Sequence, residues 1–583
     1  MPSSSKPLAA RSLIIGLDGA DLSVIEALGA ARLPNLFKAM ERGVYAAQQS
    51  VLPPATLPNW ATFLTGVDPG VHGVFDFTTR HGYGVQFTAG RIREAPTFFR
   101  ALDRAGLKTA CLFFPGTYPP EPLEHGVFAS GWDAPVAFAA DASFIWPRSL
   151  HAELVQRFGA QTFDDVDEFH ADAPGFHDAL GDALVRRVER RAAVAQHLLG
   201  KQAWDAFGVY FGETDTASHH LWSLWDERSP RHPAGASARA KNGLARVYEA
   251  ADRAVGALLE AAGGDDVELT IVSDHGSGGS SDKVLYLNRA LEAAGFLRMR
   301  RASTSAALPG QLKSLALRAL PPALRERIFR AAGTLLPSWL ESRVRFAAID
   351  FAHTVAFSDE LNYLPAIHFN VRGREPNGQL APADIPELRR ALEQALLALR
   401  DPWTGTPVVS AVHAREAIFS GPYLERAPDL LLELHLDPHR GSAYSYNLMP
   451  SAEAPPGRSF RKLAASEHLG RKGRSLAGSH RSHGLFVAAG PHVLPVGRLD
   501  PAMPVHIADA SAMVLARLGA APVANAMGKV LPVLHGIEPK THEHGTSRSS
   551  GPETAHAANI AGGDGLAGDR RVAERLRSLG YIE

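Results

Sequence analysis

The sequence predicts an α/β fold with a central, mostly parallel sheet flanked by helices. Short apolar runs alternate with longer amphipathic segments along the chain, which is typical of strand–helix–strand units. The runs are continuously apolar, as expected of strands that helices cover on both faces. With 583 residues, of which 45% are hydrophobic, the chain is also long enough to bury a large core.

Five apolar runs are the strand candidates, at residues 12–18, 109–115, 206–215, 268–276 and 483–491. Amphipathic segments at 92–105, 177–199 and 242–262 are expected to be helices. Two stretches fit the sheet less well and are interpreted as helical insertions that cap one edge of it, at 136–200 and 301–345. Near the end, the Gly/Ala/Ser-rich stretch 542–569 is expected to be a disordered linker, and 570–583 a short helix.

Composition excludes several classes of protein. The 60 basic and 61 acidic residues leave a net charge of -1, so no broad basic field favours nucleic acid as a partner. Cys111 is the only cysteine, which excludes an intramolecular disulfide and suits a reducing compartment. No convincing signal peptide is present, and no apolar stretch reaches the ~20 residues of a membrane span. We therefore expect a soluble, cytoplasmic protein.

Carboxylates and imidazoles gather where the apolar runs end. Asp18 and Asp215 follow two of these runs, and the pair Asp274–His275 follows a third. His480 precedes a fourth. The carboxyl ends of strands are where open α/β sheets place their ligand sites. Because gathered carboxylates repel one another, bound cations are the simplest compensation.

The spacing of these residues suits metal ions. Asp215 and His219 are four residues apart and would share one face of a helix, and the "GSGG" after His275 allows a sharp backbone turn. The full set has six members: Asp18, Asp215, His219, Asp274, His275 and His480. Six ligands exceed one tetrahedral site and suit two ions, which at ~3.5–4 Å can clamp a phosphoryl transfer. The Asp/His mixture favours Zn²⁺, with Mn²⁺ as the alternative.

The stretch "ATLPNWATFLTG" (55–66) predicts a short helix with Thr56 as N-cap, Pro58 in the first turn and Gly66 at the end. The hydroxyls of Thr62 and Thr65 are expected to bond back to preceding carbonyls. Thr56 is either a plain cap or, with a metal to activate it, a nucleophile at the anion-favouring helix end. Asn59, one turn on, is a candidate donor to a phosphoryl oxygen.

Five motifs in this order resemble the alkaline phosphatase superfamily, in its type I phosphodiesterase/nucleotide pyrophosphatase branch. They are "GLDGA" (16–20), "ATLPNWATFLTG" (55–66), "DTASH" (215–219), "SDHGSG" (273–278) and "GSHRSHG" (478–484). The resemblance covers residues 10–535 and implies one alkaline-phosphatase-like catalytic domain, with 136–200 and 301–345 as cap insertions.

The resemblance also implies a ligand set for each of two metals. One metal would be held by Asp18, Thr56, Asp274 and His275, and the other by Asp215, His219 and His480. Thr56 would attack phosphorus to form a covalent phosphothreonine, which water then hydrolyses. The implied substrate is a small-molecule phosphate ester or a nucleotide.

Several alternatives stay open. No Arg stands two residues after Pro58, which disfavours a sulfatase, whereas Asn59 favours phosphodiester or phosphonate chemistry. A phosphomonoesterase, a phosphonate hydrolase or a metal-dependent phosphomutase would share the same frame. The alternative that is not an enzyme is a non-catalytic, metal-bound scaffold. The substrate and the oligomeric state do not follow from the sequence.

Overall fold

A computed structural model describes the chain at residues 11–87, 92–131, 142–159, 171, 173–300, 346–360, 365–470 and 475–536. The insertion expected at 301–345, the linker at 542–569 and the helix at 570–583 lie outside these residues. Within the described ranges, no helix combines the length and the apolar character needed to cross a membrane.

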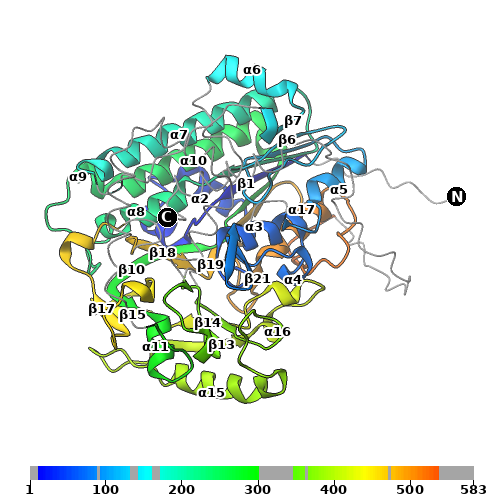
Figure 1. Ribbon diagram of the computed structural model, residues 1–583. Helices are drawn as coiled ribbons and strands as arrows, with labels where there is room; N and C mark the ends of the chain where they lie inside the picture. Colours follow the sequence, from blue (N-terminus) through cyan, green and yellow to red (C-terminus); the bar gives the residue numbers. More distant parts are fainter. Residues whose placement is uncertain are drawn as a thin grey trace.

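A ten-stranded sheet runs through the centre of the molecule (Figure 1). Its strands, in spatial order, are β20 (Gly497–Arg498), β2 (Gly43–Gln49), β19 (His483–Ala489), β9 (Glu268–Val272), β1 (Ser12–Leu17), β8 (Ala206–Phe211), β5 (Thr109–Leu112), β6 (Val127–Ala129) and β7 (Ile145–Trp146), with β21 (Val505–His506) also paired to β2. All neighbours from β9 to β6 are parallel, whereas β19 and β7 run antiparallel to theirs. The predicted mostly parallel sheet is therefore confirmed.

All five predicted strands form, as β1, β5, β8, β9 and β19, and each ends earlier than its apolar run. The reason is visible at β8, which stops at Phe211 because Glu213 already begins the next helix. The polar residues at the carboxyl ends of the apolar runs are not part of the sheet and instead form loops or the first turns of helices. The residues that carry chemistry therefore lie just beyond the strands.

Helices cover both faces of this sheet (Figure 1). One layer holds α2 (Pro34–Glu41), α7 (Phe176–Leu199), α8 (Glu213–Trp225), α9 (Ala238–Lys241) and α10 (Gly243–Ala262). The other holds α3 (Thr56–Thr65), α5 (Phe98–Arg104) and α17 (Ile507–Arg517). One continuous hydrophobic core joins both layers to the sheet. The predicted helices at 177–199 and 242–262 are α7 and α10, while only the second half of 92–105 is helical, as α5.

The described part of 136–200 extends the sheet edge. It contains η2 (Ala142–Phe144), the edge strand β7, α6 (Ser149–Phe158) and α7. Helix α7 packs along α10 and α8 and so belongs to the layer that flanks the sheet. Smaller elements elsewhere are α1 (Leu22–Leu28), α4 (Pro69–His72) and the hairpin of β3 (Thr78–His81) with β4 (Gly84–Phe87).

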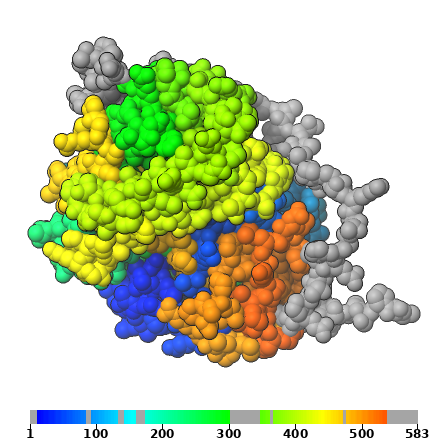
Figure 2. All heavy atoms as spheres, turned by 90° about the horizontal axis from the view of Figure 1, so that it is seen from below, coloured from blue at the N-terminus to red at the C-terminus, as the bar shows by residue number. Residues whose placement is uncertain are grey.

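A second, smaller layer has its own sheet and core, which the sequence did not reveal. Its antiparallel sheet has the order β11 (Ala356–Phe357), β12 (Ala366–Phe369), β14 (Leu430–Leu434), β13 (Val409–Ala414). Around it lie α11 (Leu287–Ala293), α15 (Ile385–Leu397) and α16 (Arg415–Ile418). Residues such as Leu291, Ile367 and Leu392 form a core separate from the main one. Figure 2 shows this yellow-green layer beside the blue and orange terminal parts.

One long strand connects the two layers. β10 (Gly276–Leu285) pairs with β18 (Gly478–Arg481) near the central sheet, and further on with β16 (Ser442–Leu448) and β17 (Phe460–Lys462). β15 (Asp437–His439) completes this third sheet. Because α11 follows β10 almost directly, the smaller layer is anchored by a strand that starts next to His275, one of the predicted metal ligands.

Candidate metal centre

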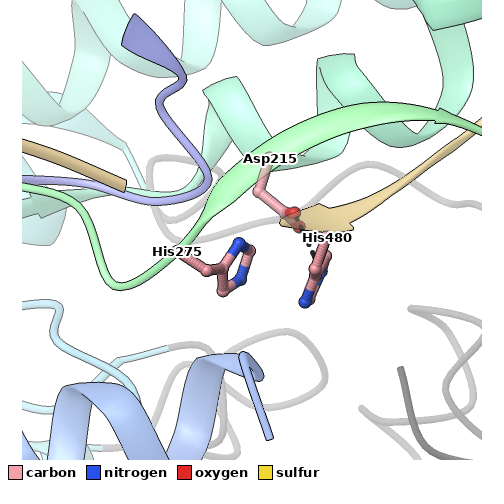
Figure 3. Close-up of side chains that lie close together, drawn as sticks. All are labelled: Asp215, His275 and His480. Carbon is pink, nitrogen blue, oxygen red and sulfur yellow. Dashed lines mark ion pairs between the residues drawn. The ribbon is translucent and has the colours of Figure 1, made fainter. Parts of the chain in front are cut away.

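The three adjacent parallel strands β9, β1 and β8 deliver their polar residues to one edge of the sheet. Asp18 follows β1 directly, Asp274 and His275 follow β9 after Ser273, and Asp215 lies in the first turn of α8 after β8. His480 comes from β18, which runs antiparallel to the β10 strand that His275 leads into. Figure 3 shows Asp215, His275 and His480 directed toward one another from these elements.

Asp18, Asp274 and His275 form one group whose ligand atoms all lie within 4.8 Å of one another. His275 Nε2 lies 3.2 Å from Asp274 Oδ2 and 3.5 Å from Asp18 Oδ1. The Thr56 hydroxyl oxygen lies 3.4 Å from the same His275 nitrogen. The structure thus brings together the four residues that the resemblance assigned to one metal.

A second group adjoins the first. Asp215 and His480 gather with His275 within the same 4.8 Å limit, and the His275 and His480 rings stack at 3.6 Å. His219 Nε2 lies 3.1 Å from Asp215 Oδ1 and 2.9 Å from His480 Nε2. His480 Nε2 is 3.4 Å from the same carboxylate oxygen. The three residues assigned to the other metal therefore also meet, and His275 lies between the two groups.

Backbone carbonyls fix the orientation of all three imidazoles. His275 Nδ1 lies 3.0 Å from the Gly276 oxygen, His219 Nδ1 3.1 Å from that of Gly478, and His480 Nδ1 2.7 Å from that of Pro54. A carbonyl oxygen only accepts, so each Nδ1 carries the proton and, in a neutral ring, each Nε2 presents a lone pair. Three Nε2 lone pairs and the carboxylates therefore converge as acceptors, which is the donor set that a cation requires.

The electrostatics of the site point the same way. Burial raises the pKa of Asp274 well above its usual range, and the nearby Asp18 carboxylate adds to this effect. Burial lowers the pKa of His275 well below its usual range and that of His480 to about 4, so both rings are neutral near pH 7. Asp274 Oδ2 is buried and accepts no hydrogen bond from any described residue. These residues fit a bound cation, which would stabilise the ionised carboxylates.

Thr56 occupies the first turn of α3, but the expectation that it is the N-cap is wrong by one residue. The N-cap is Ala55, and no side chain caps the helix. Because the Thr56 backbone is already helical, its hydroxyl is not a capping group, and the plain-cap interpretation does not hold. The helix ends before Gly66, as predicted, and this glycine has a left-handed conformation with φ 73°.

The two later threonines of α3 behave differently from each other. The Thr65 hydroxyl donates to the Ala61 carbonyl at 2.6 Å, as predicted. The Thr62 hydroxyl instead pairs with His72 Nε2 at 3.0 Å, so the expected bond to a preceding carbonyl is wrong there. His72 comes from the neighbouring α4, a contact that spacing within one helix could not reveal.

Asn59 does not have the contacts expected of a phosphoryl donor. Its Oδ1 accepts from the Val51 backbone N–H at 2.7 Å. Its Nδ2 lies 2.9 Å from the Ala55 oxygen, 3.0 Å from the Pro53 oxygen and 3.3 Å from the Val51 oxygen. Both N–H bonds of this fully buried amide are therefore directed at the loop that leads to Thr56. In this structure the Asn59 amide holds that loop, and the role of phosphoryl donor that the sequence suggested stays a prediction.

Comparison with known proteins identifies the family. Residues 12–449 match the family described as type I phosphodiesterase/nucleotide pyrophosphatase. The chain belongs to this family. As a member, it is a metal-dependent phosphoester hydrolase, and the clustered Asp and His residues are candidate ligands for its divalent metal.

Solved structures similar to this family member include two hydrolases. Murine ectonucleotide pyrophosphatase/phosphodiesterase 5 is 13% identical with a TM-score of 0.45, covering 90% of this chain and 100% of its own. Phosphonoacetate hydrolase from Sinorhizobium meliloti 1021, in complex with phosphonoformate, is 17% identical with a TM-score of 0.49, covering 88% of this chain and 96% of its own. A comparison with curated proteins gives no match.

Proposed function

We propose that this family member hydrolyses a phosphate diester or phosphoanhydride of a small molecule or nucleotide through a covalent phosphothreonine on Thr56. Two divalent ions, Zn²⁺ rather than Mn²⁺, would be held by seven residues: Asp18, Thr56, Asp274 and His275 for one, and Asp215, His219 and His480 for the other. The mixture of carboxylate and imidazole ligands supports Zn²⁺.

The observation that carries this proposal is that the Thr56 hydroxyl, which does not cap its helix, lies beside the cluster of carboxylates and imidazoles. Thr56 Oγ1 lies 3.4 Å from His275 Nε2, at the start of a helix that has no side-chain cap. A threonine hydroxyl needs activation, because its free pKa is far above neutrality. When bound, divalent ions supply that activation and stabilise charge on the attacking and leaving oxygens.

The chain's own residues then have defined roles. Thr56 Oγ1 forms the bond to phosphorus as the bond to the leaving oxygen breaks, and its proton passes to solvent. The positive end of α3 lies at Thr56 and favours the anionic phosphoryl group there. The carbonyls of Pro54, Gly276 and Gly478 hold the imidazoles in their tautomer. Water finally hydrolyses the phosphothreonine and restores the hydroxyl.

The decisive experiment compares Thr56→Ala with Thr65→Ala on the same helix. Thr56→Ala should abolish turnover while the metal content stays near that of the wild type. Thr65→Ala loses a bond to the Ala61 carbonyl and a long bond of 3.5 Å from the Val67 N–H, neither of them at the candidate metal centre, and should keep turnover. Mass spectrometry of quenched wild-type enzyme should find the phosphate on the peptide that contains Thr56. Unchanged turnover in Thr56→Ala would refute the proposal.

The substrate class is tested with p-nitrophenyl monoesters, diesters, phosphonates and sulfates, each with Zn²⁺ and with Mn²⁺. A diester preference over monoester of about 100-fold corresponds to about 2.7 kcal/mol of differential transition-state binding. Preference for a monoester or a phosphonate would instead indicate that the same site belongs to a phosphomonoesterase or a phosphonate hydrolase. Metal binding without turnover of any of these esters would favour a scaffold.

A further inference from the structure

Two aromatic side chains donate to Oδ2 of Asp18, whereas Oδ1 is the carboxylate oxygen found 3.5 Å from His275 Nε2. We propose that Tyr210 and Trp60 form a two-donor clamp that orients Asp18 and thereby sets the affinity of its metal site. They are positioning residues, since neither touches the reacting atoms. This inference rests on the proposed function, because it assigns a metal to the group of Asp18, Asp274 and His275.

The clamp is built from hydrogen bonds to a single oxygen. The Tyr210 hydroxyl donates to Asp18 Oδ2 at 2.6 Å, and Trp60 Nε1 donates to the same atom at 3.0 Å. The other oxygen, Oδ1, lies 3.5 Å from His275 Nε2 on the side of the candidate metal. Two donors on Oδ2 hold the carboxylate plane, so that Oδ1 is directed into the site.

The two donors come from different elements, so the clamp also ties those elements together. Tyr210 lies on β8, directly beside Gly16 of β1, and Trp60 lies on α3, one turn after Thr56. The same carboxylate thus connects the helix of the candidate nucleophile to the sheet that carries the ligands. A second contact supports this alignment, because the Thr214 hydroxyl donates to the Asp18 backbone oxygen at 2.5 Å.

Packing holds both donors in place. The Trp60 and Tyr210 rings meet edge to face, with centroids 5.4 Å apart, and both side chains are at most 2% exposed. Phe114 packs edge to face against Trp60, with centroids 5.2 Å apart. A Cβ at Gly16 would lie only 2.8 Å from the Trp60 ring, so glycine leaves the room that Trp60 needs to reach Asp18. The donors are therefore preorganised.

A structural role alone would also place these bonds, since a buried hydroxyl or indole N–H needs an acceptor. The chain offers a matched control for that possibility. The Tyr444 hydroxyl donates to Asp226 Oδ2 at 2.9 Å, and Tyr444 is 1% exposed. Asp226 is not among the clustered ligands. Tyr444→Phe therefore removes the same kind of bond from a buried carboxylate outside the candidate metal centre.

The experiment measures metal affinity by competition with a chromophoric chelator, first for the wild-type chain and then for Tyr210→Phe and Tyr444→Phe. Tyr210→Phe should weaken one of two Zn²⁺ sites by about 10-fold or more, the effect expected when the partner of a metal ligand is lost. The second site and both sites of Tyr444→Phe should stay near the wild-type values. Excess Zn²⁺ should restore the activity of Tyr210→Phe.

Trp60→Phe provides a second variant that keeps an aromatic ring and loses the N–H, and it should weaken the same site. Near-UV circular dichroism of each metal-free variant checks that the core is intact. Wild-type affinity at both sites in Tyr210→Phe and Trp60→Phe would overturn the clamp while leaving the proposed function in place. A wild-type chain that binds fewer than two ions would instead refute the proposed function, and this inference with it.

Discussion

Replacing Asn59 with alanine tests whether this residue positions the loop before Thr56 or contacts the substrate. The side chain is fully buried and its amide contacts only the backbone of the loop at 51–55 and the start of α3. That loop carries the Pro54 carbonyl that accepts from His480 Nδ1, and it ends at Thr56. Asn59→Ala should therefore lower both stability and turnover.

The contacts of Asn59 give the size of the effect. Alanine leaves the Val51 N–H buried without its acceptor, which costs about 1–3 kcal/mol. It also removes donors from the Ala55 and Pro53 carbonyls, at about 1 kcal/mol for each hydrogen bond. The free energy of unfolding should fall by about 3–5 kcal/mol, since the two contributions add. Turnover should fall as well, because the Pro54 carbonyl no longer fixes the His480 tautomer.

Urea unfolding of the metal-free chain and steady-state kinetics of the loaded chain provide the two measurements. Asn370→Ala is the matched control, because its buried amide also donates to backbone carbonyls, those of Phe351 and Thr354, but within the smaller layer. It should lose comparable stability and keep its turnover. If Asn59→Ala loses turnover with no loss of stability, the positioning argument is refuted and a direct substrate contact is favoured.

Three further predictions concern charge. Chelation should lower the unfolding temperature, because the buried carboxylates of the site then repel one another; Zn²⁺ at about 100 times its Kd should restore about 2.7 kcal/mol. Burial lowers the pKa of His72 to about 3, below its unfolded value, so His72 should contribute a loss of about 1.4 kcal/mol of stability per pH unit as pH falls from about 6.5 towards 3, and His72→Asn should make the slope shallower by that amount. Glu213→Gln leaves the buried Arg187 and the half-buried Arg191 without their carboxylate and should cost about 3–5 kcal/mol by urea unfolding, whereas the exposed Glu227→Gln should change little.

The central sheet and part of the site follow from local patterns. Asp18, Asp215 and Asp274 each follow an apolar run, and adjacent parallel strands bring such residues to one edge. His480 is different, since it reaches the site only through the pairing of β18 with β10, a contact between residues about two hundred positions apart. The apolar run that follows it made His480 a candidate ligand, but its assignment to one of the two metals came only from the resemblance to a family.

Features that depend on tertiary contacts could not be predicted from the sequence. In the smaller layer, β11 is only two residues long and β13 is only partly buried, so these two strands lack the continuous apolar pattern that marks the central strands. The environment of Asn59 depends on the path of the loop at 51–55. That of Thr62 depends on the neighbouring α4, which supplies His72. These partners lie mostly outside the helix that carries Asn59 and Thr62, and so the pattern of that helix does not reveal them.

The glycines after His275 belong to a correctly identified motif, but the physical reason predicted for them is wrong. A sharp turn was expected there, but Gly276 begins the extended strand β10. A Cβ at Gly276 would lie 2.0 Å from the His483 oxygen, and one at Gly478 would lie 2.1 Å from the Ser218 oxygen. Glycine is required because β10, β18 and α8 approach closely. That approach brings His480 to Asp215, so these glycines allow the close packing of the elements that carry the candidate metal ligands.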